Sequence, residues 1–227
     1  MTGWLTARRD SSDVFADRPE AGRALATVLT DYAGPDTVVL GVPRGGVVVG
    51  AEVARALEAP LDVVIARKIG HPDQPELAVG AVVGEEGYPV LNDELVAALR
   101  VPEAYLQSEI ARQREEICRR SRLYRGDAPP APLAGKVVIV VDDGVATGYT
   151  LKAAVAAVRA AGPARLIVAV PVASEQAVEM LRPLVDELVC LRTPPFFQAV
   201  GLHFTDFSQV TDAEVTALLA AARGSPN

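Results

Sequence analysis

The sequence predicts an α/β fold in which helices flank a twisted parallel sheet. Short β-branched runs alternate with longer Ala- and Leu-rich segments, as in chains whose parallel strands are connected through helices. The runs 38–42, 137–141 and 166–170 are nonpolar throughout, which is typical of strands buried on both faces. With 227 residues, half of them hydrophobic, the chain suits a single domain over residues 1–227.

Composition and charge narrow the classes of function. The net charge of −7 disfavours general attraction to nucleic acid or to an anionic membrane, although arginines over 112–125 leave one local basic face open. No apolar run approaches the length of a membrane span, and the first residues show no apolar region of the kind found in secretory signals, so we expect no such signal. Two cysteines, Cys118 and Cys190, cannot form a disulfide framework or a zinc cage. We therefore expect a cytoplasmic protein.

Local signals place the individual elements. Asp17 and Glu20 form a capping box at the start of a first helix, which Gly34 and Pro35 end. Further helices are expected over 47–57, 92–99, 102–124, 150–161 and 174–182, and strands over 38–42, 61–66, 137–141, 166–170 and 187–191.

Two segments do not fit the alternating pattern. Residues 69–90 are rich in Gly, Pro and charge, with one β-like piece over 78–83, and we interpret them as a mobile hairpin or loop that acts as a flexible lid. Residues 193–227 begin with an irregular, aromatic stretch and are expected to form a hood, with contributions from the N-terminal segment. The aromatic side chains of Phe196, Phe197, Phe204 and Phe207 suit either stacking on a planar base or a small core within the hood.

The chemistry is concentrated in residues 137–150. An apolar strand leads to two carboxylates, Asp142 and Asp143, and then to a Gly- and Thr-containing loop that starts a helix. Free backbone N–H groups at a helix N-terminus suit a phosphate, and the Thr147 and Thr150 hydroxyls add donors. The carboxylates would repel that phosphate, so their partners are expected to be sugar hydroxyls or Mg²⁺. The alternative is that they only cap the strand and the helix.

This run resembles the motif that binds phosphoribosyl pyrophosphate (PRPP) in type I phosphoribosyltransferases. Two further stretches match the family: Gly-Val-Pro-Arg-Gly-Gly over 41–46, and Arg67-Lys68 at the end of the strand predicted over 61–66. The order and spacing fit from about residue 15 to residue 192. The stretches DRPEAG, GVPRGG, RKIG and DDGVATG are similar to those of a little-characterised bacterial subgroup.

The resemblance implies a role for each matched residue. The family's phosphate loop corresponds to Val145, Ala146, Thr147, Gly148, Tyr149 and Thr150, and its pyrophosphate loop to Arg44, Gly45 and Gly46. Asp142 and Asp143 would hold the ribose hydroxyls and Mg²⁺, while Arg44, Arg67 and Lys68 would bind pyrophosphate. Family members often have a non-proline cis peptide before the residue equivalent to Arg44.

The implied activity is Mg²⁺-dependent transfer of the 5-phosphoribosyl group from PRPP to a nitrogenous acceptor, with Asp142, Asp143, Arg44 and Lys68 as catalytic residues and with a homodimer as the assembly. Ala146 stands where 6-oxopurine enzymes of the family keep an aspartate, which argues against hypoxanthine or guanine as the acceptor. A PRPP-binding sensor without catalysis, or a partner module, is the alternative. Taken singly, Arg67 and Lys68 are equally consistent with solvated cations at a strand end.

Overall fold

The fold is built on a five-stranded, wholly parallel sheet. The computed structural model describes residues 14–84 and 88–224, so the remaining parts of the predicted domain, lid and hood lie outside the described residues. The strand order in the central sheet is β2-β1-β6-β7-β8. These strands are β2 (Leu61–Val63), β1 (Thr37–Gly41), β6 (Val137–Val141), β7 (Arg165–Val172) and β8 (Glu187–Arg192). The parallel sheet predicted from the alternating pattern is confirmed.

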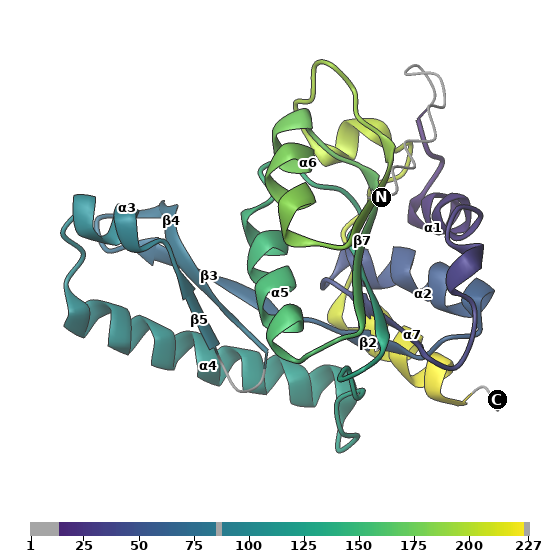
Figure 1. The fold of residues 1–227 in the computed structure, drawn as a ribbon, viewed down its shortest axis with the longest axis horizontal. Helices are drawn as coiled ribbons and strands as arrows, with labels where there is room; N and C mark the ends of the chain where they lie inside the picture. The colour runs from purple at the N-terminus through teal and green to yellow at the C-terminus, as the bar shows by residue number, and fades with distance from the viewer. Residues whose placement is uncertain (1–13, 85–87, 225–227) are drawn as a thin grey trace.

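Helices cover both faces of this sheet (Figure 1). Alternate residues of β6 face opposite ways, so that Val138 and Val140 pack in one apolar core while Ile139 and Val141 pack in the other. The first core contains residues of α5 (Tyr149–Ala160) and α6 (Glu175–Leu181), and the second contains residues of α1 (Arg18–Ala26), α2 (Gly45–Leu57), α4 (Glu103–Arg125) and α7 (Asp212–Gly224). Short 3₁₀ turns lie at Thr30–Tyr32, Arg182–Leu184 and Val200–His203.

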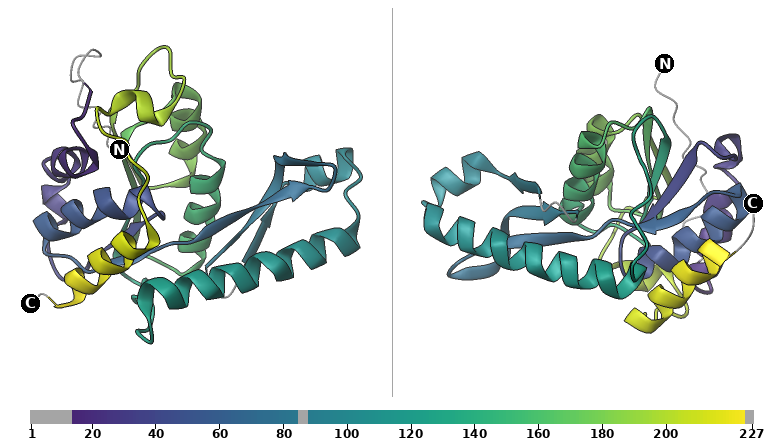
Figure 2. Two further views of the ribbon diagram at one scale, coloured as in Figure 1. Left: turned by 180° about the vertical axis from the view of Figure 1, so that it is seen from behind. Right: turned by 90° about the horizontal axis from the view of Figure 1, so that it is seen from below.

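A second sheet projects from the domain as an arm, which consists of β3, β4, β5, α3 and the first half of α4 (Figures 1 and 2). Its strands are antiparallel in the order β3-β4-β5, and its elements are β3 (Ala66–His71), β4 (Gln74–Val83), β5 (Tyr88–Leu91) and α3 (Asp93–Ala98). The hairpin interpretation of 69–90 is therefore confirmed for the described residues, but the β structure is much more extensive than the piece expected over 78–83.

Two expectations about the elements are wrong. The strand expected over 61–66 is divided, because β2 ends at Val63 and the chain leaves the parallel sheet before β3 begins at Ala66. Arg67 and Lys68 consequently lie within an antiparallel strand of the arm and not at the end of a core strand. The C-terminal segment contains an element for which no prediction was made, the 13-residue helix α7, which packs beside α2 and α4 and contradicts no expectation.

Candidate functional site

Two of the predicted motifs leave the sheet side by side. Strands β1 and β6 are neighbours, and their last residues, Gly41 and Val141, are paired in register. The backbone N–H of Val42 continues this pairing with a 2.9 Å hydrogen bond to the carbonyl of Val141. Residues 42–46 and the acidic pair that follows β6 therefore meet at the carboxyl edge of the sheet, where open α/β sheets bind their ligands.

The glycines after Arg44 are required by the acidic pair. A Cβ atom on Gly45 would lie 1.8 Å from the Asp143 Oδ2 atom, and one on Gly46 would lie 2.8 Å from the Asp142 Cα atom. Both distances are far below van der Waals contact, so a side chain at position 45 would displace the Asp143 carboxylate and one at position 46 would displace the backbone of Asp142. The residues predicted to bind pyrophosphate and those predicted to bind ribose thus form one packed unit.

Burial sets the electrostatics of the two carboxyl groups. Burial raises the pKa of Asp142 well above its usual value, and the neighbouring Asp143 carboxylate raises it further. Burial also raises the pKa of Asp143, but a 2.7 Å ion pair with the Arg18 Nε atom opposes this shift. The Asp142 Oδ1 atom accepts a 2.9 Å hydrogen bond from the backbone N–H of Asp143. Charge at this pair is costly, and a cation or a hydroxyl donor would stabilise it.

Arg44 lies at the start of α2, and the Pro43–Arg44 peptide bond is cis, as the resemblance implies. Its Nη1 atom lies 3.9 Å from the Asp212 Oδ1 atom in the first turn of α7. About a third of the Arg44 side chain is exposed, so the guanidinium group remains accessible to an anion.

The loop from Val145 to Thr150 has the form expected of a phosphate site. Val145 is anchored by hydrogen bonds between its N–H and the Val172 carbonyl and between its own carbonyl and the Ser174 N–H. Gly148 has a left-handed backbone with φ of 78° and directly precedes α5. Ala146, Thr147, Tyr149 and Thr150 are exposed, and across the described ranges the backbone N–H groups of residues 146–150 donate no hydrogen bond. The loop therefore offers free donors at a helix N-terminus.

Lys68 and Arg67 lie on opposite faces of β3. Lys68 pairs across the strands with Ala81, which packs in the same core as Leu151 of α5, whereas Arg67 pairs with Val82 in the other core. Lys68 therefore lies on the face of the arm that is directed toward the start of α5. Arg67 lies on the opposite face, which is directed toward α4. The prediction that both residues bind pyrophosphate from one strand end is not supported for Arg67.

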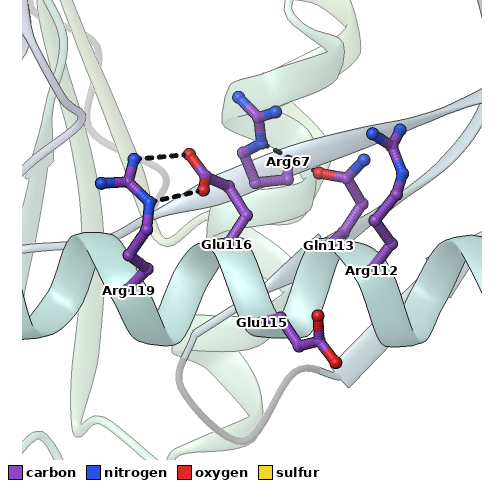
Figure 3. Close-up of a pocket in the computed structure, with 6 residues that line it drawn as sticks. All are labelled: Arg67, Arg112, Gln113, Glu115, Glu116 and Arg119. Atoms are coloured by element: carbon purple, nitrogen blue, oxygen red, sulfur yellow. Dashed lines mark hydrogen bonds and ion pairs between the residues drawn. The ribbon is translucent and has the colours of Figure 1, made fainter.

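Arg67 instead borders a polar pocket over α4 (Figure 3). Its Nε atom donates a 3.0 Å hydrogen bond to the Gln113 Oε1 atom. The pocket has a volume of about 340 Å³ and is lined by Arg67, Arg112, Gln113, Glu115, Glu116 and Arg119. The arginines on α4 are interleaved with acidic partners, since Arg112 pairs with Glu109 and both Arg119 and Arg120 pair with Glu116. This pairing counts against a basic face for nucleic acid.

The phenylalanines of the predicted hood, residues 193–227, lie in different surroundings. Phe204 is buried, and its ring centroid lies 5.6 Å from that of Phe15 and 5.1 Å from that of Phe207. These rings form a small core, one of the two alternatives left open by the sequence. Phe197 stacks on His203 at 5.3 Å, while Phe196 is 88% exposed.

Two residues of the site were missed by sequence reasoning. Arg18 forms the buried ion pair with Asp143 across 125 positions of the chain, and Asp212 approaches Arg44 from α7. The stretch DRPEAG, which contains Arg18, was the available signal for the first, because it is among the stretches that the subgroup shares. No signal in the sequence identified Asp212.

Comparison with known proteins agrees with this geometry. The family model of the phosphoribosyl transferase domain matches residues 16–205. Two Mycobacterium tuberculosis proteins, from strains CDC 1551 / Oshkosh and H37Rv, are each 45% identical over 209 residues, and each carries the name "Putative phosphoribosyl transferase". The match covers 92% of this chain but 47% of either relative, so the chain spans about half the length of the curated relatives it matches.

A solved structure is also similar to this chain over almost its whole length. The crystal structure of TT1426 from Thermus thermophilus has 47% sequence identity to this chain and superposes with a TM-score of 0.81, over 92% of this chain and 98% of that one. Among the residues that the structure describes, no helix is both long enough and apolar enough to cross a membrane. The matched family covers the central sheet and all the motifs described above, and the chain belongs to the phosphoribosyl transferase domain family.

Proposed function

We propose that the protein transfers the 5-phosphoribosyl group from PRPP to a nitrogenous acceptor and releases pyrophosphate. The observation that carries this proposal is the packing of Gly45 and Gly46 directly against Asp142 and Asp143, beside a loop of free N–H groups. A phosphate, a sugar diol and a pyrophosphate are the three parts of PRPP, and the chain offers a suitable set of groups for each of them.

Each motif would have one task in the reaction. The N–H groups of residues 146–150 bind the 5-phosphate, and Asp142 and Asp143 accept hydrogen bonds from the ribose hydroxyls. Arg44 and Lys68 bind the pyrophosphate. The bond between the ribose C1 atom and pyrophosphate breaks, with its electron pair leaving on the pyrophosphate oxygen. The acceptor nitrogen forms the new bond to C1 and loses its proton to solvent water. Positioning and charge stabilisation supply most of the catalysis.

The acidic pair also fits Mg²⁺. Magnesium is usually held by one or two carboxylates together with substrate phosphates. The ranges 14–84 and 88–224 contain no group of three or more His, Cys, Asp or Glu residues that could hold a metal ion, so Asp142 and Asp143 would share the ion with oxygens of the substrate. When bound, the ion would neutralise part of the charge on pyrophosphate.

The proposal also includes the oligomeric state of the protein, its cellular compartment and the role of the arm as a lid. We expect a homodimer in the cytoplasm, and we expect the arm, with the described part of 69–90, to cover the site during the reaction. Exclusion of water would protect PRPP from hydrolysis.

The test is a calorimetric titration of the full chain with PRPP, with and without Mg²⁺. Wild-type protein is expected to bind PRPP in a metal-dependent manner, and Asp142→Asn combined with Asp143→Asn is expected to abolish binding without loss of the fold. Asp36→Asn is the matched control, because Asp36 lies before β1 at the opposite edge of the same sheet and pairs with Lys136. Unchanged PRPP affinity in the double variant would refute the assignment of the acidic pair.

A pyrophosphate-release assay against purines, pyrimidines and other nitrogen nucleophiles then separates an enzyme from a sensor. Release with one acceptor identifies the substrate. Binding of PRPP without release from any acceptor favours the sensor or the partner module.

A further inference from the structure

Arg18 is the residue that connects the acidic pair to the rest of the domain. It is the first residue of α1, directly after the cap residue Asp17, whose side chain accepts a 2.7 Å hydrogen bond from the Glu20 N–H. Only 10% of the Arg18 side chain is exposed, and the Asp143 side chain that it meets is 15% exposed. A cation so well buried requires specific partners.

The guanidinium group of Arg18 has three such partners. Its Nε atom donates to the Asp143 Oδ2 atom at 2.7 Å, and its Nη1 atom donates to the Ser208 carbonyl at 2.8 Å. The face of the group lies 3.8 Å from the centre of the Phe207 ring. A planar fork that is hydrogen-bonded at its edge and stacked on its face is fixed in position and orientation, which the point charge of a lysine would not reproduce.

The same group borders the pyrophosphate loop. A Cβ atom on Gly45 would lie 2.7 Å from the Arg18 Nε atom as well as 1.8 Å from the Asp143 Oδ2 atom. The ion pair between Arg18 and Asp143 therefore lies against the backbone of Gly45. Any movement of the Asp143 carboxylate changes the space available to that loop.

Residues of the C-terminal hood pack against Arg18 and against Gly144, and so support the ion pair between Arg18 and Asp143. Phe207, which packs on Arg18, also packs on Gly201, where a Cβ atom would lie 2.9 Å from the Phe207 ring. Val200, the neighbour of Gly201, contacts Gly144 so closely that a Cβ atom there would lie 2.4 Å from the valine Cγ1 atom. The hood thus contacts Gly144 directly through Val200. It supports Asp143 indirectly, because Phe207 packs on Arg18, the ion-pair partner of Asp143.

We propose that Arg18 is a positioning residue of the phosphoribosyl site: it fixes the Asp143 carboxylate against the Gly45 backbone, and the hood fixes Arg18. A buried ion pair gives little net stability compared with apolar packing of equal volume, so the effect of this pair lies in the placement of the carboxylate. Removing the cation would leave Asp143 buried without its partner, and the carboxylate would move or lose its charge.

The inference rests on the proposed function for its effect on ligand binding, so it is tested in two ways. The first uses amide hydrogen exchange on the chain without ligand. The N–H of Asp143 donates to Asp142 at 2.9 Å and that of Val42 to Val141 at 2.9 Å, so both amides report the order of the site. Arg18→Gln is expected to increase exchange at both. Arg23→Gln, on a half-exposed residue of the same helix, is the control and is expected to leave them unchanged.

The second test is a double-mutant cycle on the affinity for PRPP with Mg²⁺. Arg18→Gln is expected to weaken binding by at least about tenfold in the wild-type background and by less than about twofold in the Asp143→Asn background, because Arg18 acts through that carboxylate. Arg18→Lys is expected to give partial rescue. If Arg18→Gln does not fold, Phe207→Leu takes its place, because it removes the ring under the guanidinium group and keeps every charge.

The outcomes are distinct. Equal loss of affinity in both backgrounds, or unchanged exchange at Asp143 and Val42, overturns the role of Arg18. Absence of PRPP binding by the wild-type chain overturns the proposed function instead, and the exchange experiment still decides whether Arg18 orders the acidic pair.

Discussion

The hydroxyl group of Tyr124 donates a 2.6 Å hydrogen bond to the Oδ1 atom of Asp212. The same carboxylate oxygen lies 3.9 Å from the Nη1 atom of Arg44. Tyr124 belongs to α4 and is only 2% exposed, while Asp212 begins α7. These contacts connect the helix of the arm, the C-terminal helix and the loop 42–46, which is proposed to bind pyrophosphate.

Ionisation of Tyr124 is expected to lower the free energy of unfolding of the protein at alkaline pH. Burial and the hydrogen bond to Asp212 raise the pKa of Tyr124 to about 12 from the ordinary value of 10.0. Below pH 10 the phenol is neutral in both states, and between pH 10 and 12 the unfolded chain loses the proton first. The free energy of unfolding should therefore decrease across that window, by the order of 2 kcal/mol. Urea denaturation of wild type and Tyr124→Phe at pH 9 and pH 11 measures this, and the variant should lose less stability over that interval.

Tyr32 provides an internal reference for that experiment. Burial and a hydrogen bond to Glu187 raise its pKa to about 12 as well, at a position remote from Asp212. Tyr124→Phe should keep the contribution of Tyr32. An identical alkaline loss in wild type and Tyr124→Phe would contradict the prediction.

Gly45→Ala is expected to disrupt the site, because its Cβ atom would lie 1.8 Å from the Asp143 Oδ2 atom. PRPP affinity should fall below detection, and the melting temperature should decrease as well, since overpacking typically costs about 1–3 kcal/mol. Gly50→Ala is the matched control on the same helix. Its Cβ atom would lie no closer than 3.4 Å to a neighbour, so this variant should bind normally. Normal PRPP binding by Gly45→Ala would show that the loop can move away from Asp143.

Substitutions of Lys68 and Arg67, the two cationic residues of β3, are expected to affect the affinity for pyrophosphate differently. Lys68→Gln should weaken pyrophosphate binding by about tenfold, the usual value of a charge-assisted hydrogen bond. Arg67→Gln should leave it unchanged, because the Arg67 side chain contacts Gln113 of α4. Isothermal titration with pyrophosphate and Mg²⁺ compares the two variants. A larger effect for Arg67 would mean that the strand turns over when ligand binds.

Arg44→Ala is expected to weaken the binding of pyrophosphate much more than the binding of ribose 5-phosphate. The guanidinium group belongs to the loop 42–46 that is proposed to bind pyrophosphate, outside the loop 145–150 that is proposed to bind the 5-phosphate. Affinity for pyrophosphate should fall by about tenfold or more, while affinity for ribose 5-phosphate should change by less than about twofold. Equal losses for both ligands would remove Arg44 from the pyrophosphate site.

Sequence reasoning worked best where the determinants are contiguous. The run from β6 through the phosphate loop into α5 keeps its apolar strand, acidic pair, glycines and helix within fourteen residues, 137–150, so local rules were sufficient. The central parallel sheet followed from the same pattern repeated along the chain. The glycines at 45 and 46 were identified from the motif, although the carboxylates that require them lie nearly a hundred residues away.

Long-range contacts were out of reach for the same physical reason. Nothing near Arg18 shows that its partner is Asp143, because the pairing depends on how α1 packs against α2 and β7, beside the residues that follow β6. The face toward which Arg67 points depends on the register of β3 with β4, and a shift of one residue would reverse it. The division of 61–66 into two strands depends on where the arm leaves the sheet, and the β-branched run 63–65 continues across that point without a local signal for it.

Helix α4 also has a mechanical consequence. Its 23 residues correspond to a length of about 35 Å at 1.5 Å per residue, with the Tyr124 contact near one end and the outer part of the arm at the other (Figure 2). A rigid helix of that length works as a lever: a tilt of about 5° at the α7 contact moves the far tip by about 3 Å. The leverage turns an adjustment too small to repack a core into a displacement the size of a water molecule.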